Sequence, residues 1–157
     1  MALDRNIRYG MVGGGPGAFI GEIHRSAAAL DGAMELVAGA FSSDPEKSRR
    51  QGENLHLNPD RAYGTYGEMA AQEAERPDGI DVVSIVTPNF LHHDVATTFI
   101  DEGIHVICDK PMTTTLEDAE DLCQQVAEQD VIFALTHNYS GYPLVKQARA
   151  LVEQGPA

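Results

Sequence analysis

The fold is decided by residues 7–24, which read IRYGMVGGGPGAFIGEIH. An apolar run over residues 7–12 predicts a strand, the glycine-rich segment after it predicts a loop, and the apolar spacing from Gly21 onward predicts a helix. Such a junction brings backbone N–H groups and the positive end of a helix dipole to one point. That point suits a phosphate group, and glycines allow a close approach because they carry no Cβ.

The glycine spacing differs from the usual G-x-G-x-x-G pattern of dinucleotide-binding loops. In one interpretation Gly13 and Gly15 are the first two glycines, and a following alanine takes the third place. In the other, which we prefer, Gly21 is the third glycine, and the loop through Gly17 is about three residues longer than usual. We hypothesise that this insertion between Gly15 and Gly21, which includes Pro16 and Phe19, folds over a cofactor as a small lid. A glycine turn without a ligand is the alternative.

The composition predicts one globular domain outside the membrane. The chain has 157 residues, enough for a substantial core, and 43% of them are hydrophobic. The formal net charge of -13 argues against nucleic-acid or membrane-surface partners, which select basic surfaces. The first residues form no signal-peptide core and no apolar run is long enough to span a membrane, so we expect a cytoplasmic protein.

The cysteines and histidines do not predict a metal site. Cys108 falls in a predicted strand and Cys123 in a predicted helix, and no CxxC motif is present. We therefore expect two buried thiols rather than a disulfide or metal ligands. His92 and His93 are adjacent, so they point in different directions on a helix and do not form a metal pair.

Strand and helix patterns alternate along the whole chain. Continuous apolar runs predict further strands at residues 35–41, 80–87, 104–108 and 131–136, with a short edge strand near 58–63. Helical spacing predicts helices at about residues 21–30, from 45 onward, and at about 65–75, 91–102, 116–129 and 143–153. This alternation implies right-handed crossovers and a doubly wound parallel sheet in a three-layer α/β/α arrangement.

Polar residues predict where helices begin. Thr65 caps one helix, with Glu68 completing a capping box, and Thr115 caps another. Asn89 follows the strand at residues 80–87 and is expected to cap the next helix.

The carboxyl ends of the strands are the expected ligand-binding edge of such a sheet. The segments at that edge are also the polar and unusual ones of the chain. They are the glycine loop and residues 41–43, 87–89, 109–111 and 137–139. This agreement points to one site along that edge.

The end of the second predicted strand bears on the identity of a dinucleotide. An acidic residue there holds the ribose hydroxyls of NAD. This chain has Ser42 and Ser43, which could donate to a 2′-phosphate, and Arg49 or Arg50 could reach the same group. The pattern favours NADP over NAD. Ser43 and Asp44 also suit a helix cap, and both roles are compatible.

Asp109-Lys110-Pro111 ends another predicted buried strand. A lysine there is costly unless its ammonium reaches a ligand or a carboxylate. Pro111 is a candidate for a cis peptide bond that aims Lys110 at the ligand-binding edge. The alternative is a surface lysine that pairs with Asp109.

With these segments in order, the chain resembles the glucose–fructose oxidoreductase/inositol dehydrogenase/rhizopine catabolism (Gfo/Idh/MocA) family. The matching segments are the glycine loop through Gly21-x-Ile23-His24, Ser43-Asp44-Pro45-Glu46-Lys47, Thr87-Pro88-Asn89-x-x-His92, Cys108-Asp109-Lys110-Pro111, and Asn138-Tyr139 followed by Pro143. The family's lysine motif is usually Glu-Lys-Pro, so this chain carries a shorter acid in the same place.

The resemblance implies a Rossmann-type dinucleotide-binding domain over residues 1–155. It also implies an NAD(P)-dependent oxidoreductase of sugars, cyclitols or related alcohols, with Lys110 as the catalytic residue that assists proton transfer at the substrate hydroxyl. We predict these cofactor-binding residues: Gly13, Gly15, Gly17, Gly21, Ser42, Ser43, Thr87, Pro88, Asn89, His92, Asp109, Lys110 and Asn138.

The resemblance also implies a second α/β domain, which this chain does not contain. In the family that domain carries the dimer surface and further catalytic residues, so we expect weak cofactor binding and little turnover from residues 1–157 alone. The expected partners are a small sugar-like substrate and, for the longer protein, further copies of itself. The alternatives are a non-catalytic NAD(P)-binding regulatory or interaction module, and an oligomerisation fragment without a ligand.

Overall fold

The computed structural model describes residues 4–155, in which strands and helices alternate. The strands are β1 (Ile7–Gly13), β2 (Met34–Ala40), β3 (Val82–Val86), β4 (His105–Cys108) and β5 (Phe133–Leu135). The α-helices are α1 (Phe19–Ala29), α2 (Pro45–Asn54), α3 (Tyr66–Glu75), α4 (His92–Asp101), α5 (Leu116–Gln129) and α6 (Pro143–Gln154). Short 3-10 turns form η1 (Pro59–Arg61), η2 (Asn89–Leu91) and η3 (Asn138–Gly141).

All five strands are parallel and lie in the order β2-β1-β3-β4-β5. The chain therefore winds outward in one direction from β1 to β2 and in the other from β3 to β5. The direction changes between β1 and β3, and crevices at such switch points bind ligands. The predicted doubly wound parallel sheet is confirmed.

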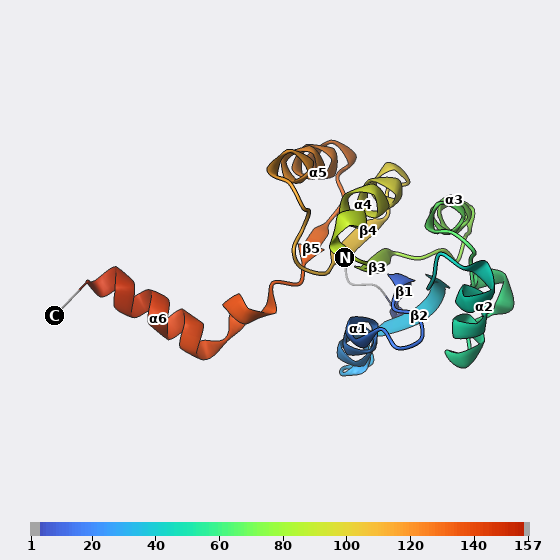
Figure 1. Cartoon of the computed structure of the whole chain (residues 1–157), viewed down its shortest axis with the longest axis horizontal. Helices are drawn as coiled ribbons and strands as arrows, with labels where there is room; N and C mark the ends of the chain where they lie inside the picture. The colour runs from blue at the N-terminus through green and yellow to red at the C-terminus, as the bar shows by residue number, and fades with distance from the viewer. Residues whose placement is uncertain (1–3, 156–157) are drawn as a thin grey trace.

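Helices α3, α4 and α5 cover one face of the sheet, α1 lies on the other, and α2 lies beside β2 (Figure 1). Every residue of β3 is buried, which explains why its sequence is apolar apart from Ser84. On the face of α3, α4 and α5, the larger core cluster includes Val83, Ile85 and Phe99. On the α1 face, β4 and β5 are covered less: Ile107 is half-buried and Ala134 is exposed.

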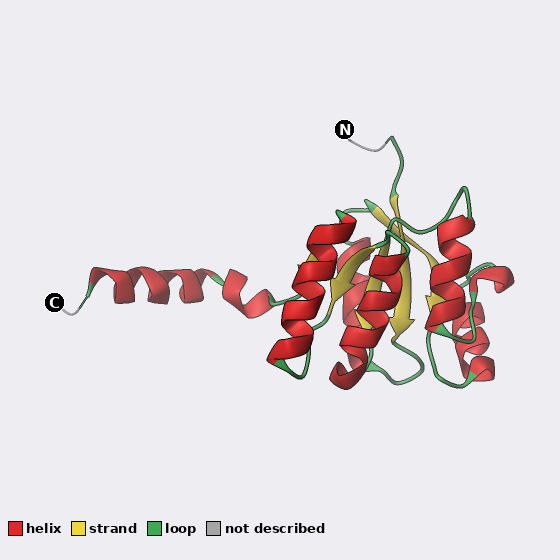
Figure 2. Cartoon of the chain, turned by 90° about the horizontal axis from the view of Figure 1, so that it is seen from above, coloured by secondary structure: helices red, strands yellow, loops and turns green. Residues whose placement is uncertain are grey.

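Helix α6 extends away from the sheet, as both ribbon views show (Figures 1 and 2). Every residue of this helix is exposed, including Leu144, Leu151 and Val152. The other helices each bury at least one residue. The sheet and its covering helices thus form the body of the molecule, and α6 projects from it.

Both predicted threonine caps, Thr65 and Thr115, are confirmed. The Thr65 hydroxyl accepts a hydrogen bond from the N–H of Glu68 at 3.2 Å, and the Thr115 hydroxyl accepts one from the N–H of Asp118 at 3.1 Å. These bonds satisfy backbone donors that the first turn of a helix leaves without a partner.

The prediction of an edge strand at residues 58–63 is wrong. The segment forms the turn η1, followed by a single bridge between Ala62 and Gly39 of β2. The Asn58 side chain accepts a hydrogen bond from the N–H of Asp60 at 3.0 Å, and this local bond competes with strand pairing.

Two further local predictions are also wrong. Asn89 does not cap a helix: it is exposed and begins η2, and α4 starts only at His92. Cys123 is exposed on α5, whereas Cys108 is buried as predicted. Burial raises the pKa of the Cys108 thiol to about 12, with Asp109 as a smaller cause, so this thiol stays protonated.

Residues 4–155 contain neither a membrane-spanning helix nor a cluster of metal ligands. None of the helices in this range combines the length and the apolar character needed to cross a membrane. The same range contains no group of three His, Cys, Asp or Glu side chains that could hold a metal ion.

Candidate functional site

The glycine loop lies directly against the ends of β2 and β3, the two strands that flank β1. A Cβ on Gly13 would come within 2.8 Å of the carbonyl oxygen of Val86, and one on Gly15 within 2.7 Å of the carbonyl oxygen of Phe41. Gly13 also has a φ of +86°, which L side chains rarely adopt. The backbone therefore fits here only because these positions lack side chains.

The third close approach involves Gly21. Helix α1 begins at Phe19, two residues before the predicted start, and Ala18 provides no side-chain cap. A Cβ on Gly21 would lie 2.5 Å from the Cα of Gly14, so the helix rests on the loop through this glycine. Close helix packing is the role of the third glycine in a dinucleotide fingerprint, which supports the longer-loop interpretation. Gly17 has a φ of +80° with open space around it, so it serves the turn itself.

A cavity of about 420 Å³ lies beside the loop at the end of β2. It is lined by Gly15, Pro16, Ala18, Phe41, Ser42, Lys47 and Arg50. Ser42 is part of this lining, as predicted, whereas Ser43 is exposed and outside it. Lys47 and Arg50 stand three residues apart on α2, which places them on the same face of the helix. The cavity is therefore lined by two positive charges and a hydroxyl.

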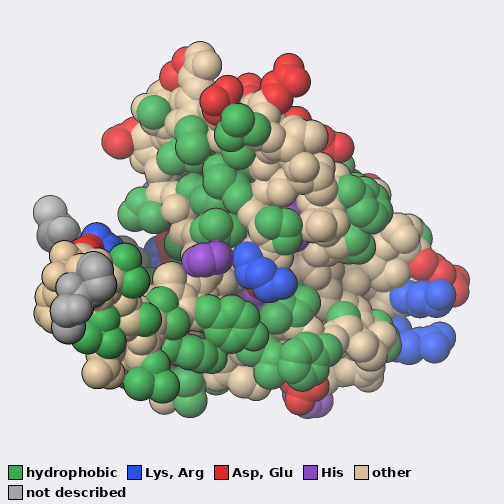
Figure 3. Space-filling model, turned by 60° about the vertical axis from the view of Figure 1, so that its left-hand side comes forward, with side chains coloured by type: hydrophobic (Ala, Val, Ile, Leu, Met, Phe, Trp, Pro, Cys, Tyr) green, Lys and Arg blue, Asp and Glu red, His purple; other side chains and the backbone are tan. Residues whose placement is uncertain are grey.

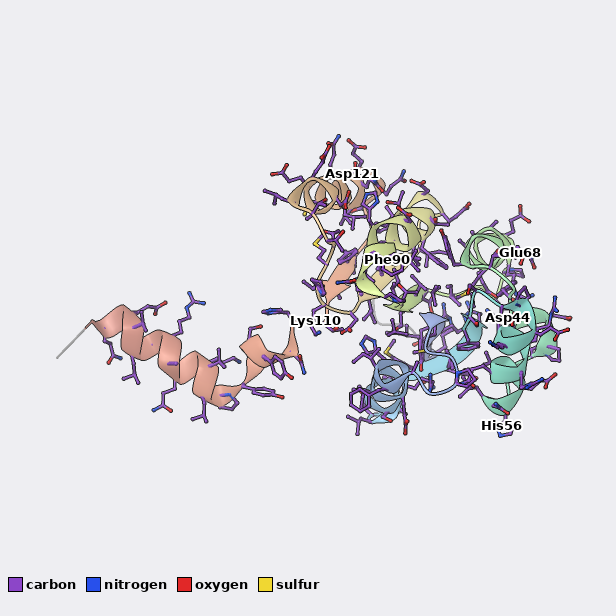
Figure 4. The ribbon with its side chains drawn as sticks, in the orientation of Figure 1. Asp44, His56, Glu68, Phe90, Lys110 and Asp121 are labelled. Atoms are coloured by element: carbon purple, nitrogen blue, oxygen red, sulfur yellow. The ribbon has the colours of Figure 1, made fainter. Side chains whose placement is uncertain are left out.

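A second cavity, of about 610 Å³, lies on the α1 face of the sheet. Apolar side chains of α1 line one side of it, and polar groups gather near the carboxyl ends of β4 and β5. Three predicted site residues line it together: Asp109, Lys110 and Asn138. Figure 4 shows Lys110 on the side of the sheet from which η3 and α6 extend. The face in Figure 3 carries many hydrophobic side chains around a Lys or Arg and a histidine.

Asp109 is held by neighbouring strands and faces α1. The Thr136 hydroxyl donates a hydrogen bond to Asp109 Oδ1 at 3.0 Å, and His24 Nε2 lies 3.8 Å from the same oxygen. His24 Nδ1 lies 2.9 Å from the Ser84 hydroxyl. Burial lowers the pKa of His24, and the nearby Asp109 carboxylate opposes this effect.

Lys110 is exposed, and among the described residues it has no ion-pair partner. The Asp109 carboxylate is engaged by Thr136, so the alternative in which Lys110 pairs with Asp109 is not supported. The Lys110–Pro111 peptide bond is cis, as predicted. The turn thus presents an uncompensated ammonium at the cavity.

The segment after β3 borders the crevice. A Cβ on Gly13 would lie 3.0 Å from the Thr87 nitrogen, so Thr87 and the glycine loop adjoin each other. In the described part of the chain, the buried Thr87 hydroxyl has no hydrogen-bond partner. Pro88 and Asn89 are exposed beside it. An unpartnered hydroxyl next to a backbone cradle fits a polar ligand at the switch point.

His92 does not fit its predicted contact with a cofactor. Its side chain is buried, with 1% of the residue surface exposed. Nδ1 lies 2.7 Å from the carbonyl oxygen of Pro111, and Nε2 lies 3.0 Å from that of Thr87. Both ring nitrogens are therefore engaged by the backbone behind the ligand-binding edge.

Several polar residues of these cavities were not among the predicted site residues, and for Lys47, Ser84 and Thr136 the sequence carries a signal. Lys47 lies one helical turn before Arg50, a spacing that groups the two. Ser84 is a polar residue within a continuous apolar strand, and Thr136 directly follows β5. Polar groups at such positions face neighbouring elements or ligands because they need partners when buried.

Comparison with known proteins agrees with this geometry. The model of an oxidoreductase family with an NAD-binding Rossmann fold matches residues 7–137. The uncharacterized oxidoreductase YfiI of Bacillus subtilis is 38% identical over 98% of this chain and 39% of its own length. Levoglucosan dehydrogenase of Pseudarthrobacter phenanthrenivorans is 29% identical over 96% of this chain and 38% of its own length.

A solved structure extends the comparison. The inositol dehydrogenase homologue from Azotobacter vinelandii, complexed with NADH and myo-inositol, is 43% identical with a TM-score of 0.90. The match covers 98% of this chain and 40% of that one. The chain thus spans about two fifths of the length of these relatives. It belongs to the Gfo/Idh/MocA family of oxidoreductases and forms the NAD-binding Rossmann fold of that family.

Proposed function

We propose that this chain is the cofactor-binding part of an NAD(P)-dependent dehydrogenase of sugars, cyclitols or related alcohols. One observation carries the proposal. The glycine loop at the β1/β3 switch point, with its close backbone contacts at Gly13, Gly15 and Gly21 (the glycine cradle), shares a sheet edge with Lys110. The Lys110 ammonium has no ion-pair partner in the described chain. Membership of the oxidoreductase family and the likeness to a homologue complexed with NADH and myo-inositol support it.

In this proposal, different residues along that edge bind the cofactor and act on the substrate. The backbone at Gly13, Gly15 and Gly21, together with the N–H groups of the first turn of α1, would hold the pyrophosphate. A bound nicotinamide supplies hydride chemistry. As the neutral amine, Lys110 would take the proton from the substrate hydroxyl during oxidation, and as the ammonium it would return that proton during reduction. Thr87 and Asn138 would border the same ligand.

The cavity beside β2 favours NADP. Its lining contains Lys47 and Arg50 but no carboxylate among the described residues, although Lys47 Nζ lies 3.8 Å from Asp44 Oδ2 just outside that lining. A 2′-phosphate is a dianion that such charges attract, whereas the ribose hydroxyls of NAD are usually held by an acidic side chain. Ser42 is available in the same lining, although its oxygen accepts a hydrogen bond from the N–H of Asp44 at 3.1 Å.

The remainder of the site belongs to a second domain in this proposal. Residues 1–155 form the dinucleotide-binding domain, and the substrate pocket and the oligomer surface come from the part that the longer relatives possess beyond this match. The weak binding and low turnover expected of residues 1–157 alone follow from that division.

The proposal is tested by fluorescence titration of this chain with NADPH and NADH. Gly15→Val should weaken binding by at least about tenfold, because the new Cβ collides with the Phe41 carbonyl. Gly67→Val is the matched control, since a Cβ at Gly67 meets nothing within 4 Å. Failure of the unaltered chain to bind either dinucleotide, or equal binding by both variants, would contradict the proposal.

A second variant separates the enzyme from a non-catalytic cofactor-binding module. Lys110→Ala should leave dinucleotide binding by this chain within about twofold of the unaltered value, because its ammonium is proposed to serve the substrate hydroxyl. In a protein that also carries the second domain, the same change should abolish turnover. Turnover that survives Lys110→Ala would refute the catalytic role.

A further inference from the structure

His92 joins two turns at the ligand-binding edge. It is the first residue of α4, and its ring lies between the carbonyl oxygens of Thr87 and Pro111. Thr87 follows β3 and adjoins the glycine loop, whereas Pro111 follows β4 and is bonded to Lys110. One buried side chain therefore connects the Thr87 segment, which borders the crevice, with the Lys110–Pro111 turn.

This link lies beyond the sheet hydrogen bonds. The last backbone bond found between the β3 and β4 segments in the described chain runs from the N–H of Asp109 to the carbonyl oxygen of Ile85, at 3.0 Å. Lys110 and Pro111 come after it, so the sheet itself does not fix them. The 2.7 Å contact of His92 Nδ1 with the Pro111 oxygen supplies a connection at that point.

The residue before Lys110 is held separately. Asp109 accepts the hydrogen bond of Thr136 and faces His24, both on the α1 side of the turn. Lys110 thus stands between two fixed neighbours, while its own side chain is exposed and without an ion pair among the described residues. This arrangement fixes the backbone and leaves the ammonium available.

We propose that His92 is a positioning residue, which fixes the Lys110–Pro111 turn against the crevice through the Pro111 carbonyl. The inference rests on the proposed function, because it assigns the nicotinamide end of the cofactor to that turn. Burying an imidazole without partners is costly, so its two carbonyl contacts account for a histidine at this position. Carbonyl oxygens only accept hydrogen bonds, so the ring must donate. A neutral ring can donate to one of them and a charged ring to both.

Three substitutions separate the two contacts. His92→Asn places an amide nitrogen near the position of Nδ1 and can donate to Pro111, whereas His92→Gln reaches toward the position of Nε2 and Thr87. His92→Leu removes both donors. The matched control is His93→Asn on the adjacent residue, whose half-buried ring contacts Asp121 on α5 at 2.8 Å.

Each variant is titrated with the reduced dinucleotide that the unaltered chain binds more tightly and with ADP-ribose, which lacks nicotinamide. His92→Leu should weaken dinucleotide binding by about tenfold and ADP-ribose binding by less than about twofold. His92→Asn should recover most of the loss and His92→Gln little of it, while His93→Asn matches the unaltered chain. Equal weakening of both ligands by His92→Leu, an unchanged dinucleotide affinity, or better recovery with His92→Gln would overturn the proposal.

A measurement without a cofactor separates this inference from the proposed function. The Met112 amide shares a peptide unit with the Pro111 carbonyl, so its NMR chemical shift reports the hydrogen bond to that oxygen. The shift should change in His92→Leu and His92→Gln but stay near the unaltered value in His92→Asn and His93→Asn. If the unaltered chain binds no dinucleotide, the proposed function fails and the Met112 shift still decides whether His92 holds the turn. An unmoved shift in His92→Leu overturns the inference.

Discussion

Gly14 and Gly21 pack so closely that a Cβ on Gly21 would lie 2.5 Å from the Cα of Gly14. The contact joins the loop after β1 to the first turn of α1. The position of the helix N-terminus is therefore coupled to the conformation of the glycine cradle. A displacement at either residue changes the direction of the N–H groups that a pyrophosphate would meet.

Gly21→Ala should consequently reduce both stability and dinucleotide affinity. Forcing a methyl group into this contact should lower the free energy of unfolding by about 1–3 kcal/mol, as overpacking does elsewhere. Urea denaturation measures the first effect and NADPH or NADH titration the second. Gly67→Ala on α3 is the control: its Cβ meets nothing within 4 Å, and the change should stabilise the helix by about 0.5–1 kcal/mol. If the Gly21→Ala protein is as stable as the unaltered chain, the loop can move aside at little energetic cost, and the predicted coupling is wrong.

The charges of the cavity beside β2 should set the choice between the two dinucleotides. Lys47→Glu or Arg50→Glu should each weaken NADPH binding by about tenfold relative to NADH, because a carboxylate repels the 2′-phosphate. Arg49→Glu makes the same charge change outside the lining and should leave the affinity ratio nearly constant. If all three variants shift the ratio equally, the net charge of the surface decides the preference rather than this cavity.

Acid should destabilise the folded chain through His24. Burial lowers the pKa of its imidazole below the ordinary value of 6.5, against the opposing effect of Asp109. The unfolded chain therefore binds the proton more readily, and the stabilisation present above pH 6.5 is lost as the pH falls through the lower folded pKa. Between about pH 7 and pH 5, His24→Gln should lose less unfolding free energy than the unaltered chain.

His93 is the control for this prediction, because its pKa is shifted in the opposite direction from that of His24. Burial tends to lower its pKa, but the hydrogen bonds that its ring donates to the Asp121 and Asp94 carboxylates outweigh that effect and raise it. Its stabilisation is complete below pH 6.5 and is lost as the pH rises through the folded pKa. His93→Gln should therefore lose more stability than the unaltered chain on acidification. Identical pH slopes for the two variants would refute both assignments.

A buried ion pair near the opposite end of the sheet should matter for folding but not for the ligand. Glu73, in the last turn of α3, pairs with Arg61 and accepts a 2.7 Å hydrogen bond from the Tyr63 hydroxyl. Glu73→Ala leaves Arg61, which is 6% exposed, with only the Asp78 carboxylate at 3.5 Å, and should cost about 3 kcal/mol in unfolding free energy, at the low end for a broken buried pair. Arg149→Ala, which breaks an exposed pair on α6, should change little. Dinucleotide affinity of the folded Glu73→Ala chain should stay unchanged, and a loss of affinity at full folding would contradict this separation.

Apolar runs made the strands predictable because a parallel sheet covered on both faces needs uninterrupted hydrophobic residues. The wholly buried β3 is the clearest instance. The same pattern does not say which strands are neighbours, so the adjacency of β1 and β3 came only from the structure. The edge strand near Ala62 was wrong because a local Asn58 turn outcompeted pairing, which residue type alone does not settle.

Part of the candidate site was predictable for a related reason: its residues follow strands, and the ends of parallel strands share one edge. Lys110 and Asn138 indeed line one cavity. The direction of a side chain depends on the turn that carries it, and sequence spacing does not supply that turn. His92 lies within a predicted site segment, yet its ring points back to two carbonyl groups.

Helix α6 has an energetic consequence of its own. It has twelve residues, all exposed, and projects from the body of the molecule (Figure 1). Isolated helices of about this length are only marginally stable in water, because nucleation costs more than a few turns recover. The helicity of residues 143–154 is thus an equilibrium that any surface packing on Leu144 and Leu151 would shift toward order. Amide exchange in this segment would report such docking directly.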